Sequence, residues 1–496
     1  MITCDFQLRG DMSLCEYLYS TIKDQVRSGS LKEGEKLPSK RSLASHLGVS
    51  VITVANAYAR LISEGYMYSV EKKGFFVASD YVDVPEALQH VKQTREPSVV
   101  GEGASEESAR DKKNTLLADF RTNSINVEKF PFSVWNAAMR DVLKEPHESL
   151  LRSPPPHGVY ELRREIAEYL RCFRDMDVDP SQIIIGAGTE YITFIVVSLF
   201  GRNAVYCVEN PGYRKIASVF QMNGARCVPV NVDDEGIDVR AVRESGASVV
   251  HVSPSHHFPT GTVMSLNRRL ELLSWAAADE NHFIIEDDYD SEFRFTGRPL
   301  ETLFGAASKS VIACGKGAGH VIYTNTFSKT LSPSFRISYM VLPPHLAEKF
   351  RQNASFLTCP VSVFEQSALS RFMQNGSYEK HIIRMKNYYR NLRNSLIQSI
   401  SASPLVYISS IREQNAGLHF LLEFNVPVSG KQLQRRFLEN GLDIPLLSEY
   451  WIGDGLNELD KPVFVMNYSG ISHEVIPEAV ARMNEAIKSV YRLKNM

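Results

Sequence analysis

The sequence lacks the features that would place the protein in a membrane or in an oxidising compartment. No run of about 18 apolar residues occurs, and the N-terminal MITCDFQLRGD has neither the basic start nor the apolar core of a secretory signal. The seven cysteines are scattered, odd in number and without a CxxC pair, which argues against a disulfide framework and a structural zinc site. We therefore expect a soluble, cytoplasmic protein with no membrane partner and no metal.

An excess of charge of one sign is also missing. Lys and Arg number 55 against 57 Asp and Glu, a formal net charge of −2, so any nucleic-acid partner must be argued from a local motif. The 44% of hydrophobic and 23% of charged residues are typical of a globular chain and exclude a disordered or fibrous one. A length of 496 residues predicts several domains.

One segment divides the chain into two parts. Residues 80–114 carry eight acidic and five basic residues and almost no apolar periodicity. Such a segment cannot bury enough surface to offset the entropy of ordering it. We predict a flexible linker at 80–114, a first domain at 1–79, called the head, and a second domain at 115–496, called the body.

The head carries the pattern of a helix-turn-helix. Apolar residues at helical spacing predict a helix over 14–29, and Ser39 can begin a second helix that ends near Gly48. Ser50 can begin a third helix, and two short helices around a glycine turn are typical of this motif. Strand-like residues on both sides of a Lys-Lys-Gly turn predict a β-wing.

Over residues 12–78 this segment resembles the winged helix-turn-helix of the GntR family of bacterial regulators. The matching features are GxxLPSxRxLAxxLxVSxxTVxxAYxxLxxEGY and the wing glycine before FFV. The resemblance implies double-stranded promoter or operator DNA as a partner, with the third helix in a major groove and the wing at phosphates. The residues expected at DNA are Ser39, Arg41, Ser50, Val51, Thr53, Lys72 and Lys73.

The head departs from the family where bases would be read. Val51 stands where relatives often carry Arg, and an Arg–guanine contact is worth about 1–3 kcal/mol of discrimination. Residues 1–78 hold ten basic and eight acidic residues, a net charge of +2. One head should therefore bind weakly, and we expect a homodimer that presents two.

The body alternates short apolar runs with amphipathic helical runs. Runs such as IIIGAG, AVYCVE and HFIIED, separated by helices, predict βαβ units and a mostly parallel, buried sheet. From about residue 375, a helix and further strands predict a smaller α+β lobe.

Two motifs at strand ends carry the chemistry. A lone lysine is usually a solvated cation, but Lys329 follows an apolar strand beside the hydroxyls of Thr326 and Ser328, with Arg336 seven residues on. Hydroxyls and a guanidinium around a lysine suit a phosphate beside an imine. The strand HFIIED ends at Asp287, which could pair with a pyridinium nitrogen. Taken alone, this second motif could also be an acidic loop that caps the next helix.

Together with IIIGAGTE (183–190), ENPGY (209–213) and SPSHHFPTG (253–261), these motifs resemble the fold-type I aminotransferases. The order of head, linker and body resembles the MocR-type subfamily of GntR-family regulators. The resemblance implies a multidomain protein: a winged helix-turn-helix (α+β), then an α/β transferase domain with a small C-terminal α+β lobe. It also implies pyridoxal 5'-phosphate as the cofactor, a bacterial cytoplasm and a head-to-tail homodimer.

By the same resemblance, Lys329 would form a Schiff base with pyridoxal phosphate, Asp287 would pair with the pyridinium nitrogen, and Tyr289 would bond the ring hydroxyl. The remaining cofactor-binding residues would be Arg336, Ser328 and the amides of Gly188 and Thr189 at the phosphate, with Thr326 beside them and Tyr213 at the ring or in an effector pocket. The adjacent His256 and His257 do not suggest a metal site, because neighbouring side chains diverge.

Two functions remain open. The first is a transcriptional regulator that senses pyridoxal phosphate, or an amine or amino acid that forms an external aldimine with it. The alternative is an active aminotransferase with an appended DNA-binding domain. The arginine with which transaminases bind a substrate carboxylate falls on Val465, and an effector-binding Arg of some relatives falls on Lys215. Losing a bidentate clamp favours the sensor, although a residual transaminase half-reaction remains compatible with the sequence.

Overall fold

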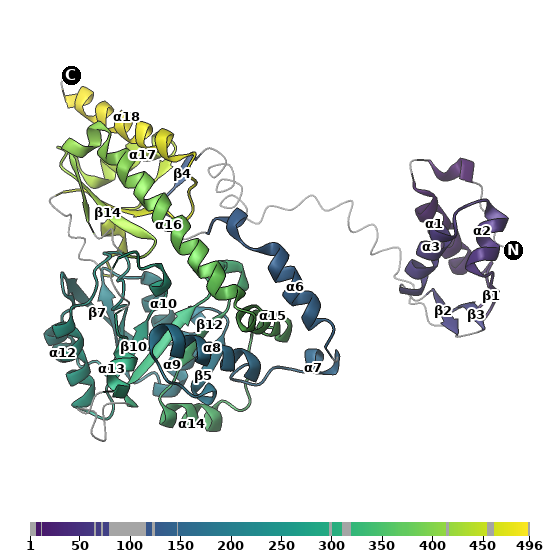
Figure 1. The fold of residues 1–496 in the computed structure, drawn as a ribbon, viewed down its shortest axis with the longest axis horizontal. Helices are drawn as coiled ribbons and strands as arrows, with labels where there is room; N and C mark the ends of the chain where they lie inside the picture. Colours follow the sequence, from purple (N-terminus) through teal and green to yellow (C-terminus); the bar gives the residue numbers. More distant parts are fainter. Residues whose placement is uncertain are drawn as a thin grey trace. The chain divides into compact units, whose positions relative to one another are not determined.

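The computed structural model describes residues 6–10, 12–63, 66–70, 73–78, 116–121, 125–145, 147–296, 300–309, 319–412, 416–453 and 461–494. The chain divides into two compact units, Met1–Glu106 and Glu107–Met496 (Figure 1). The predicted linker, residues 80–114, lies outside the described residues. Among the helices within the described ranges, none is long and apolar enough to cross a membrane.

The head is a three-helix domain with a small sheet. Its elements are α1 (Leu14–Arg27), β1 (Lys36–Leu37), α2 (Lys40–Leu47), α3 (Val51–Ser63), β2 (Met67–Val70) and β3 (Gly74–Val77). The serines at both predicted helix starts act as caps: the Ser39 side chain accepts from Ser42 N at 3.2 Å, and that of Ser50 accepts from Thr53 N at 3.0 Å. Gly48 ends α2 in the left-handed region, at φ 66°. The antiparallel strands β2 and β3 correspond to the predicted wing, and β1 completes the sheet in the order β1-β3-β2.

The body is built on an eight-stranded sheet in the order β5-β12-β11-β10-β9-β6-β7-β8. Its strands are β5 (Ile183–Gly186), β6 (Val205–Asn210), β7 (Arg226–Asp233), β8 (Gly236–Ile237), β9 (Val249–Val252), β10 (Phe283–Asp287), β11 (Val321–Thr326) and β12 (Ser338–Val341). The strands β7, β6, β9, β10 and β11 pair in parallel, and β12 is antiparallel to both its neighbours, so β5 runs in the same direction as these five. The predicted, mostly parallel sheet is confirmed.

Helices cover both faces of this sheet, which is why strands such as β9 and β12 are buried along their whole length (Figure 1). Successive residues point into different cores: Ile284 belongs to one hydrophobic cluster and Ile285 to another. The helices that accompany the sheet are α6 (Phe132–Val142), α7 (His147–Leu151), α8 (Tyr160–Arg174), α9 (Thr189–Phe200), α10 (Arg214–Met222), α11 (Val239–Ser245), α12 (Leu266–Ala277), α13 (Leu303–Lys309), α14 (Pro344–Asn353) and α15 (Val363–Gln374).

The smaller lobe contains a second, antiparallel sheet in the order β13-β14-β16. Its elements are α16 (Ser377–Ser401), β13 (Ser409–Arg412), β14 (His419–Phe424), α17 (Gly430–Glu439), β15 (Leu442–Asp443), β16 (Val463–Asn467) and α18 (Ile476–Lys494). The start of the body also joins this lobe, because β4 (Ala118–Asp119) pairs in parallel with β15. The lobe is therefore not made from the C-terminal part of the chain alone.

Candidate functional site

The two chemical motifs of the body meet at one edge of the large sheet. Strands β10 and β11 are parallel neighbours, with Asp287 in register with Thr324. Asp287 is the last residue of β10, and Lys329 follows three residues after β11 ends at Thr326. Since the carboxyl ends of parallel strands share one edge, residues some 40 apart in sequence reach the same place.

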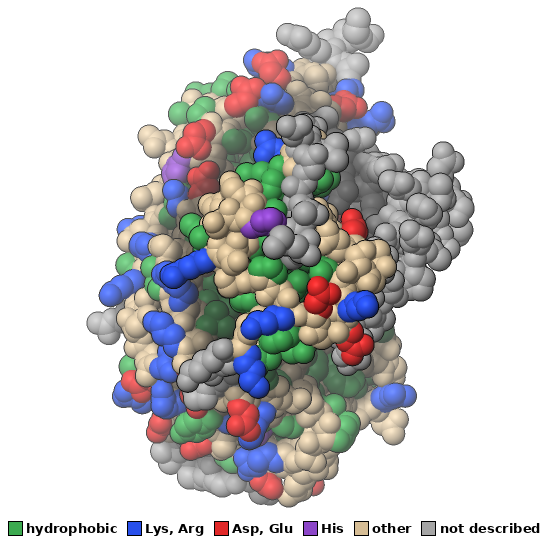
Figure 2. All heavy atoms as spheres, turned by 90° about the vertical axis from the view of Figure 1, so that its right-hand side faces the viewer, with side chains coloured by type: hydrophobic (Ala, Val, Ile, Leu, Met, Phe, Trp, Pro, Cys, Tyr) green, Lys and Arg blue, Asp and Glu red, His purple; other side chains and the backbone are tan. Residues whose placement is uncertain are grey.

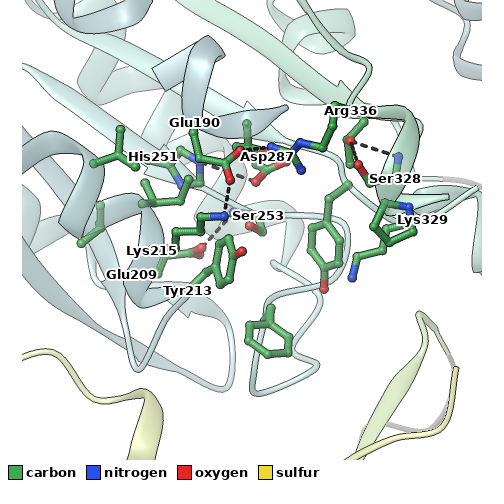
Figure 3. A pocket seen from close by; sticks show the side chains of 18 residues that line it. Glu190, Glu209, Tyr213, Lys215, His251, Ser253, Asp287, Ser328, Lys329 and Arg336 are labelled. Carbon is green, nitrogen blue, oxygen red and sulfur yellow. Dashed lines mark hydrogen bonds and ion pairs between the residues drawn. The ribbon is translucent and has the colours of Figure 1, made fainter. Parts of the chain in front are cut away.

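A cavity of about 430 Å³ opens at this edge (Figure 3). The predicted cofactor residues among its lining are Thr189, Tyr213, Asp287, Tyr289, Thr326, Ser328, Lys329 and Arg336. Gly188 immediately precedes α9 as its N-cap, beside the cavity. The structure thus brings together, around a single space, the residues that the sequence placed in one site.

Burial poises the lysine and the carboxyl group for proton exchange near neutral pH. It lowers the pKa of Lys329 to about 8, against the attraction of Asp290 and Asp287, which favour the charged amine. Burial also raises the pKa of Asp287 to about 7, with repulsion from Asp288 and Asp290 adding to it and Lys329 opposing it. A sizeable fraction of the amine is therefore neutral at pH 7–8, which is the nucleophilic form.

A histidine lies against Asp287. His251 Nε2 is 3.6 Å from Asp287 Oδ2, and burial lowers the pKa of His251 to about 4, so the imidazole is neutral. A cation on the open side of Asp287 would favour its ionised form. The protonated ring nitrogen of a pyridine is such a cation, and the site thus suits the partner predicted for this carboxylate.

The hydroxyl of Tyr289 lies against the buried pair of His256 and Asp290. Its hydroxyl lies 3.2 Å from His256 Nδ1, and the same nitrogen lies 2.9 Å from Asp290 Oδ2. His256 is itself confined, since a Cβ built on Gly417 would come within 1.9 Å of its Cε1. The position of the phenol is therefore fixed by residues from three separate segments.

Hydroxyl groups form a short chain on the Lys329 side of the cavity. Thr326 Oγ1 donates to Ser328 Oγ at 2.9 Å and accepts from Ser338 Oγ at 2.8 Å. It also accepts from the Ser328 amide at 3.1 Å, which tightens the turn between β11 and Lys329. This turn presents Ser328 and Lys329 together to the cavity.

Arg336 lies at the start of α9. A Cβ on Gly188 would be 2.1 Å from Arg336 Nη2, so only glycine allows the guanidinium this close to the helix start. The Gly188 amide donates to Gly186 O at 3.1 Å. Arg336 Nη2 donates to Glu190 Oε2 at 2.6 Å, and Lys215 donates to Glu190 Oε1. This carboxylate was not predicted, because nothing in the local sequence indicates that it meets two cations.

The opposite wall of the cavity is aromatic and apolar. Tyr213 and Phe258 make an edge-to-face contact with ring centroids 6.1 Å apart. Phe258 also packs against a buried cluster that includes Val465 and Leu421 of the smaller lobe. The strand position expected for a carboxylate-binding arginine thus lies in a hydrophobic cluster.

Further residues of the lining escaped the sequence reasoning. They are Glu190, Val208, Glu209, Ile216, Val219, His251, Ser253 and Pro333. Glu209 could have been found, because it stands near the end of β6. That strand is adjacent to β9, and β9 is adjacent to β10, which ends at Asp287. Burial raises its pKa to about 8 while the Ser253 amide donates to it at 2.9 Å.

These residues fit pyridoxal phosphate. The cavity offers the Lys329 amine with its lowered pKa and the buried Asp287 carboxyl for a ring nitrogen. It also offers the hydrogen-bonded phenol of Tyr289, and a guanidinium with hydroxyl groups for a phosphate. Its aromatic wall suits a planar ring. Among the described residues, no cluster of three or more His, Cys, Asp or Glu is arranged to hold a metal ion.

The expected DNA-contacting residues form a second, separate group in the head. Arg41, Val51 and Lys73 are exposed, whereas the Thr53 hydroxyl lies 2.8 Å from Ser50 Oγ. Lys72 lies outside the described residues. At the start of α3, Ile52 is 72% exposed and Val51 is 45% exposed, so two adjacent aliphatic side chains face outward there. On the face drawn in Figure 2, Lys and Arg side chains are interspersed with acidic and hydrophobic ones.

Two family models match the chain. Residues 14–77 match the bacterial regulatory proteins of the gntR family, and residues 119–448 match the aminotransferases of class I and II. The two matches fall on the head and the body respectively.

Proteins named as regulators are similar to this chain over nearly its whole length. The uncharacterized HTH-type transcriptional regulator YdeL of Bacillus subtilis is 35% identical, with 96% of this chain and 97% of that protein covered. The probable rhizopine catabolism regulatory protein MocR of Rhizobium meliloti is 29% identical, over 96% and 94%. The pyridoxine biosynthesis regulator PdxR of Corynebacterium glutamicum is 28% identical, over 96% of each.

Solved aminotransferases share the fold of the body. The kynurenine aminotransferase of Pyrococcus horikoshii superposes with a TM-score of 0.66 at 21% identity, covering 81% of this chain and 99% of that one. The α-aminoadipate aminotransferase LysN of Thermus thermophilus gives a TM-score of 0.64 at 23% identity, covering 78% and 95%. At these identities the likeness establishes the fold.

Proposed function

This chain belongs to the MocR-type regulators of the GntR family, with a DNA-binding head and an aminotransferase-type body whose cofactor is pyridoxal 5'-phosphate, and on that premise we propose how it works. It acts in the cytoplasm as a homodimer, with two heads on paired half-sites. The body senses pyridoxal phosphate, or an amine that reacts with it. The division into a head at 1–79, a linker at 80–114 and a body at 115–496 is part of this proposal.

The observation that carries the proposal is the meeting of Lys329 and Asp287 in one cavity. The two residues come from different strands, and each has a pKa moved toward neutrality by burial. Perturbed ionisable groups that converge on one cavity are the mark of a functional site. Burying an ionisable side chain costs free energy of folding. A sheet edge with a purely structural role would therefore be expected to carry apolar side chains at these two positions.

Each residue has a role toward the cofactor that follows from its position. When bound, pyridoxal phosphate supplies an aldehyde that condenses with primary amines and a ring that withdraws electrons. Lys329 would hold it covalently through Nζ, Asp287 would keep a proton on the ring nitrogen, and Tyr289 would donate to the ring hydroxyl. The residues proposed at the phosphate are Arg336, Ser328, Thr326, Gly188 and Thr189, with Tyr213 against the ring.

The cations of the cavity favour a sensor over an efficient aminotransferase. Of the two positions at which a carboxylate-binding cation was expected, Lys215 is bonded to Glu190 and Val465 is buried in an apolar cluster. An amino acid entering this site would therefore find no unpaired cation at either position. A relative that covers this chain is named for regulating pyridoxine biosynthesis, which supports pyridoxal phosphate itself as the effector. Rapid turnover of a panel of amino donors would favour the aminotransferase instead.

Trapping the cofactor tests the proposal. The full-length protein is incubated with pyridoxal phosphate, reduced with borohydride and digested, and the labelled peptide is identified by mass spectrometry. We expect the label on Lys329 and its complete loss in Lys329→Ala. The control is Lys144→Ala, which removes an exposed lysine that forms a surface ion pair with Asp141, and its label should be unchanged. A label that persists in Lys329→Ala, on a folded protein, would refute the assignment.

A further inference from the structure

A carboxylate occupies the cationic end of the cavity. Glu190 lies in the first turn of α9, and its two oxygens accept hydrogen bonds from Arg336 and Lys215 (Figure 3). Lys215 comes from α10 and Arg336 from the loop before β12, so three separate elements bring one anion between two cations. All three side chains line the cavity.

This carboxylate sits among the groups that would receive a phosphate. A Cβ built on Gly188 would be 2.8 Å from Glu190 Oε2 and 2.1 Å from Arg336 Nη2, so carboxylate, guanidinium and helix start are crowded into one corner. The start of a helix and a guanidinium are both preferred partners of phosphate groups. Glu190 therefore uses the interactions that the cofactor's phosphate needs.

We propose that Glu190 is a built-in competitor of the cofactor's phosphate, which weakens binding so that occupancy follows the concentration of pyridoxal phosphate. The inference rests on the proposed function, in which this cavity binds that cofactor. To admit the phosphate, the carboxylate must give up Arg336 or Lys215, or remain beside a second anion.

The charges in the corner make this cost appreciable. Arg336 and Lys215 supply two positive charges and Glu190 one negative charge, while a phosphate monoester carries about −1.5 to −2 at pH 7. Protonation does not relieve the repulsion: burial opposes ionisation, but hydrogen bonds from Lys215, the residue's own amide and Arg336 lower the pKa of Glu190 to about 2. The carboxylate stays charged throughout the physiological range.

The test compares two ligands on matched variants of the full-length protein. We expect Glu190→Gln to lower the Kd for pyridoxal phosphate about tenfold, or about 1.4 kcal/mol, measured by the absorbance change on titration. The Kd for pyridoxal, which has no phosphate, should be unchanged. Glu168→Gln is the control, because it also removes a carboxylate paired with an arginine, but on the exposed face of α8.

Three outcomes would overturn the inference: no change for pyridoxal phosphate in Glu190→Gln, weaker binding in that variant, or an equal gain for pyridoxal. If Glu190→Gln does not fold, the wild-type protein suffices. There, competition predicts that the phosphate improves affinity over pyridoxal by less than about tenfold, and a gain above about a hundredfold contradicts it. Failure of the wild-type protein to bind either ligand at Lys329 would instead refute the proposed function.

Discussion

Lys329 shows how one environment converts a common surface residue into a reactive one. Free lysine is almost wholly protonated at pH 7, whereas burial in the cavity brings the pKa of Lys329 to about 8. The neutral fraction at pH 7 is then about a tenth. Asp290 and Asp287 limit the lowering of this pKa because they favour the ammonium form. The amine therefore titrates near neutral pH instead of being uncharged at every physiological pH.

The attachment of pyridoxal phosphate should therefore depend on pH in a defined direction. The lysine pKa is lowered, so the reactive neutral amine is gained as pH rises toward 8 and is nearly complete above 9. We expect the association rate, followed by stopped-flow absorbance, to increase several-fold between pH 7 and 8 and to level off by about pH 9. A rate that keeps rising about tenfold per unit up to pH 10 would show an unperturbed lysine.

At the scale of elements, the start of helix α3 presents exposed aliphatic side chains where contact with DNA is proposed. Its first residues are aliphatic and exposed, Val51 at 45% and Ile52 at 72%. In a major groove, the apolar feature of a base edge is the methyl group of thymine. Placed in a major groove as proposed, the helix would therefore suit half-sites with thymine at the contacted positions rather than guanine.

Removing single methyl groups from selected DNA tests this preference. Operator fragments are first selected from random sequence with the full-length protein, and thymine is then replaced by uracil at each half-site position. We expect a contacted position to lose about fourfold in affinity, or ~0.8 kcal/mol for one buried methyl group, in wild type but not in Ile52→Ala. Uracil outside the half-site is the control. Selected half-sites read mainly through guanine would contradict the account.

The elements that the sequence predicted are those with local signals. Ser39, Gly48 and Ser50 indicated the helix starts and the turn of the head, and the structure gives each the expected capping role. Apolar runs indicated the strands of the large sheet, and strand-end chemistry indicated Lys329 and Asp287. In each case, neighbouring residues in the sequence carry the information.

The contacts that could not be predicted join residues that are far apart in the sequence. Glu190 meets Lys215 across 25 positions and Arg336 across 146, and neither distance leaves a pattern in the chain. The same holds for β4, which pairs with β15 in the smaller lobe.

The strands β14 and β16 are buried on both faces because one side packs in the lobe and the other meets Phe258 near the cavity.

At the scale of the whole molecule, the candidate cofactor site and helix α3, the proposed DNA-reading helix, belong to different units of one chain. A ligand can regulate DNA binding only if it binds one arrangement of the units more tightly than another. Coupling of this kind is typically 1–3 kcal/mol, about five- to 150-fold in affinity, and it acts equally in both directions. Glu190 would set the concentration at which pyridoxal phosphate begins to exert it.

The most direct test is the affinity of the full-length protein for its selected operator, measured by fluorescence anisotropy with and without saturating pyridoxal phosphate. We expect a change in Kd of at least about fivefold in wild type and none in Lys329→Ala, with both proteins folded and equally dimeric. An operator affinity that is the same with and without the cofactor, in a wild-type protein shown to carry it on Lys329, would contradict the account.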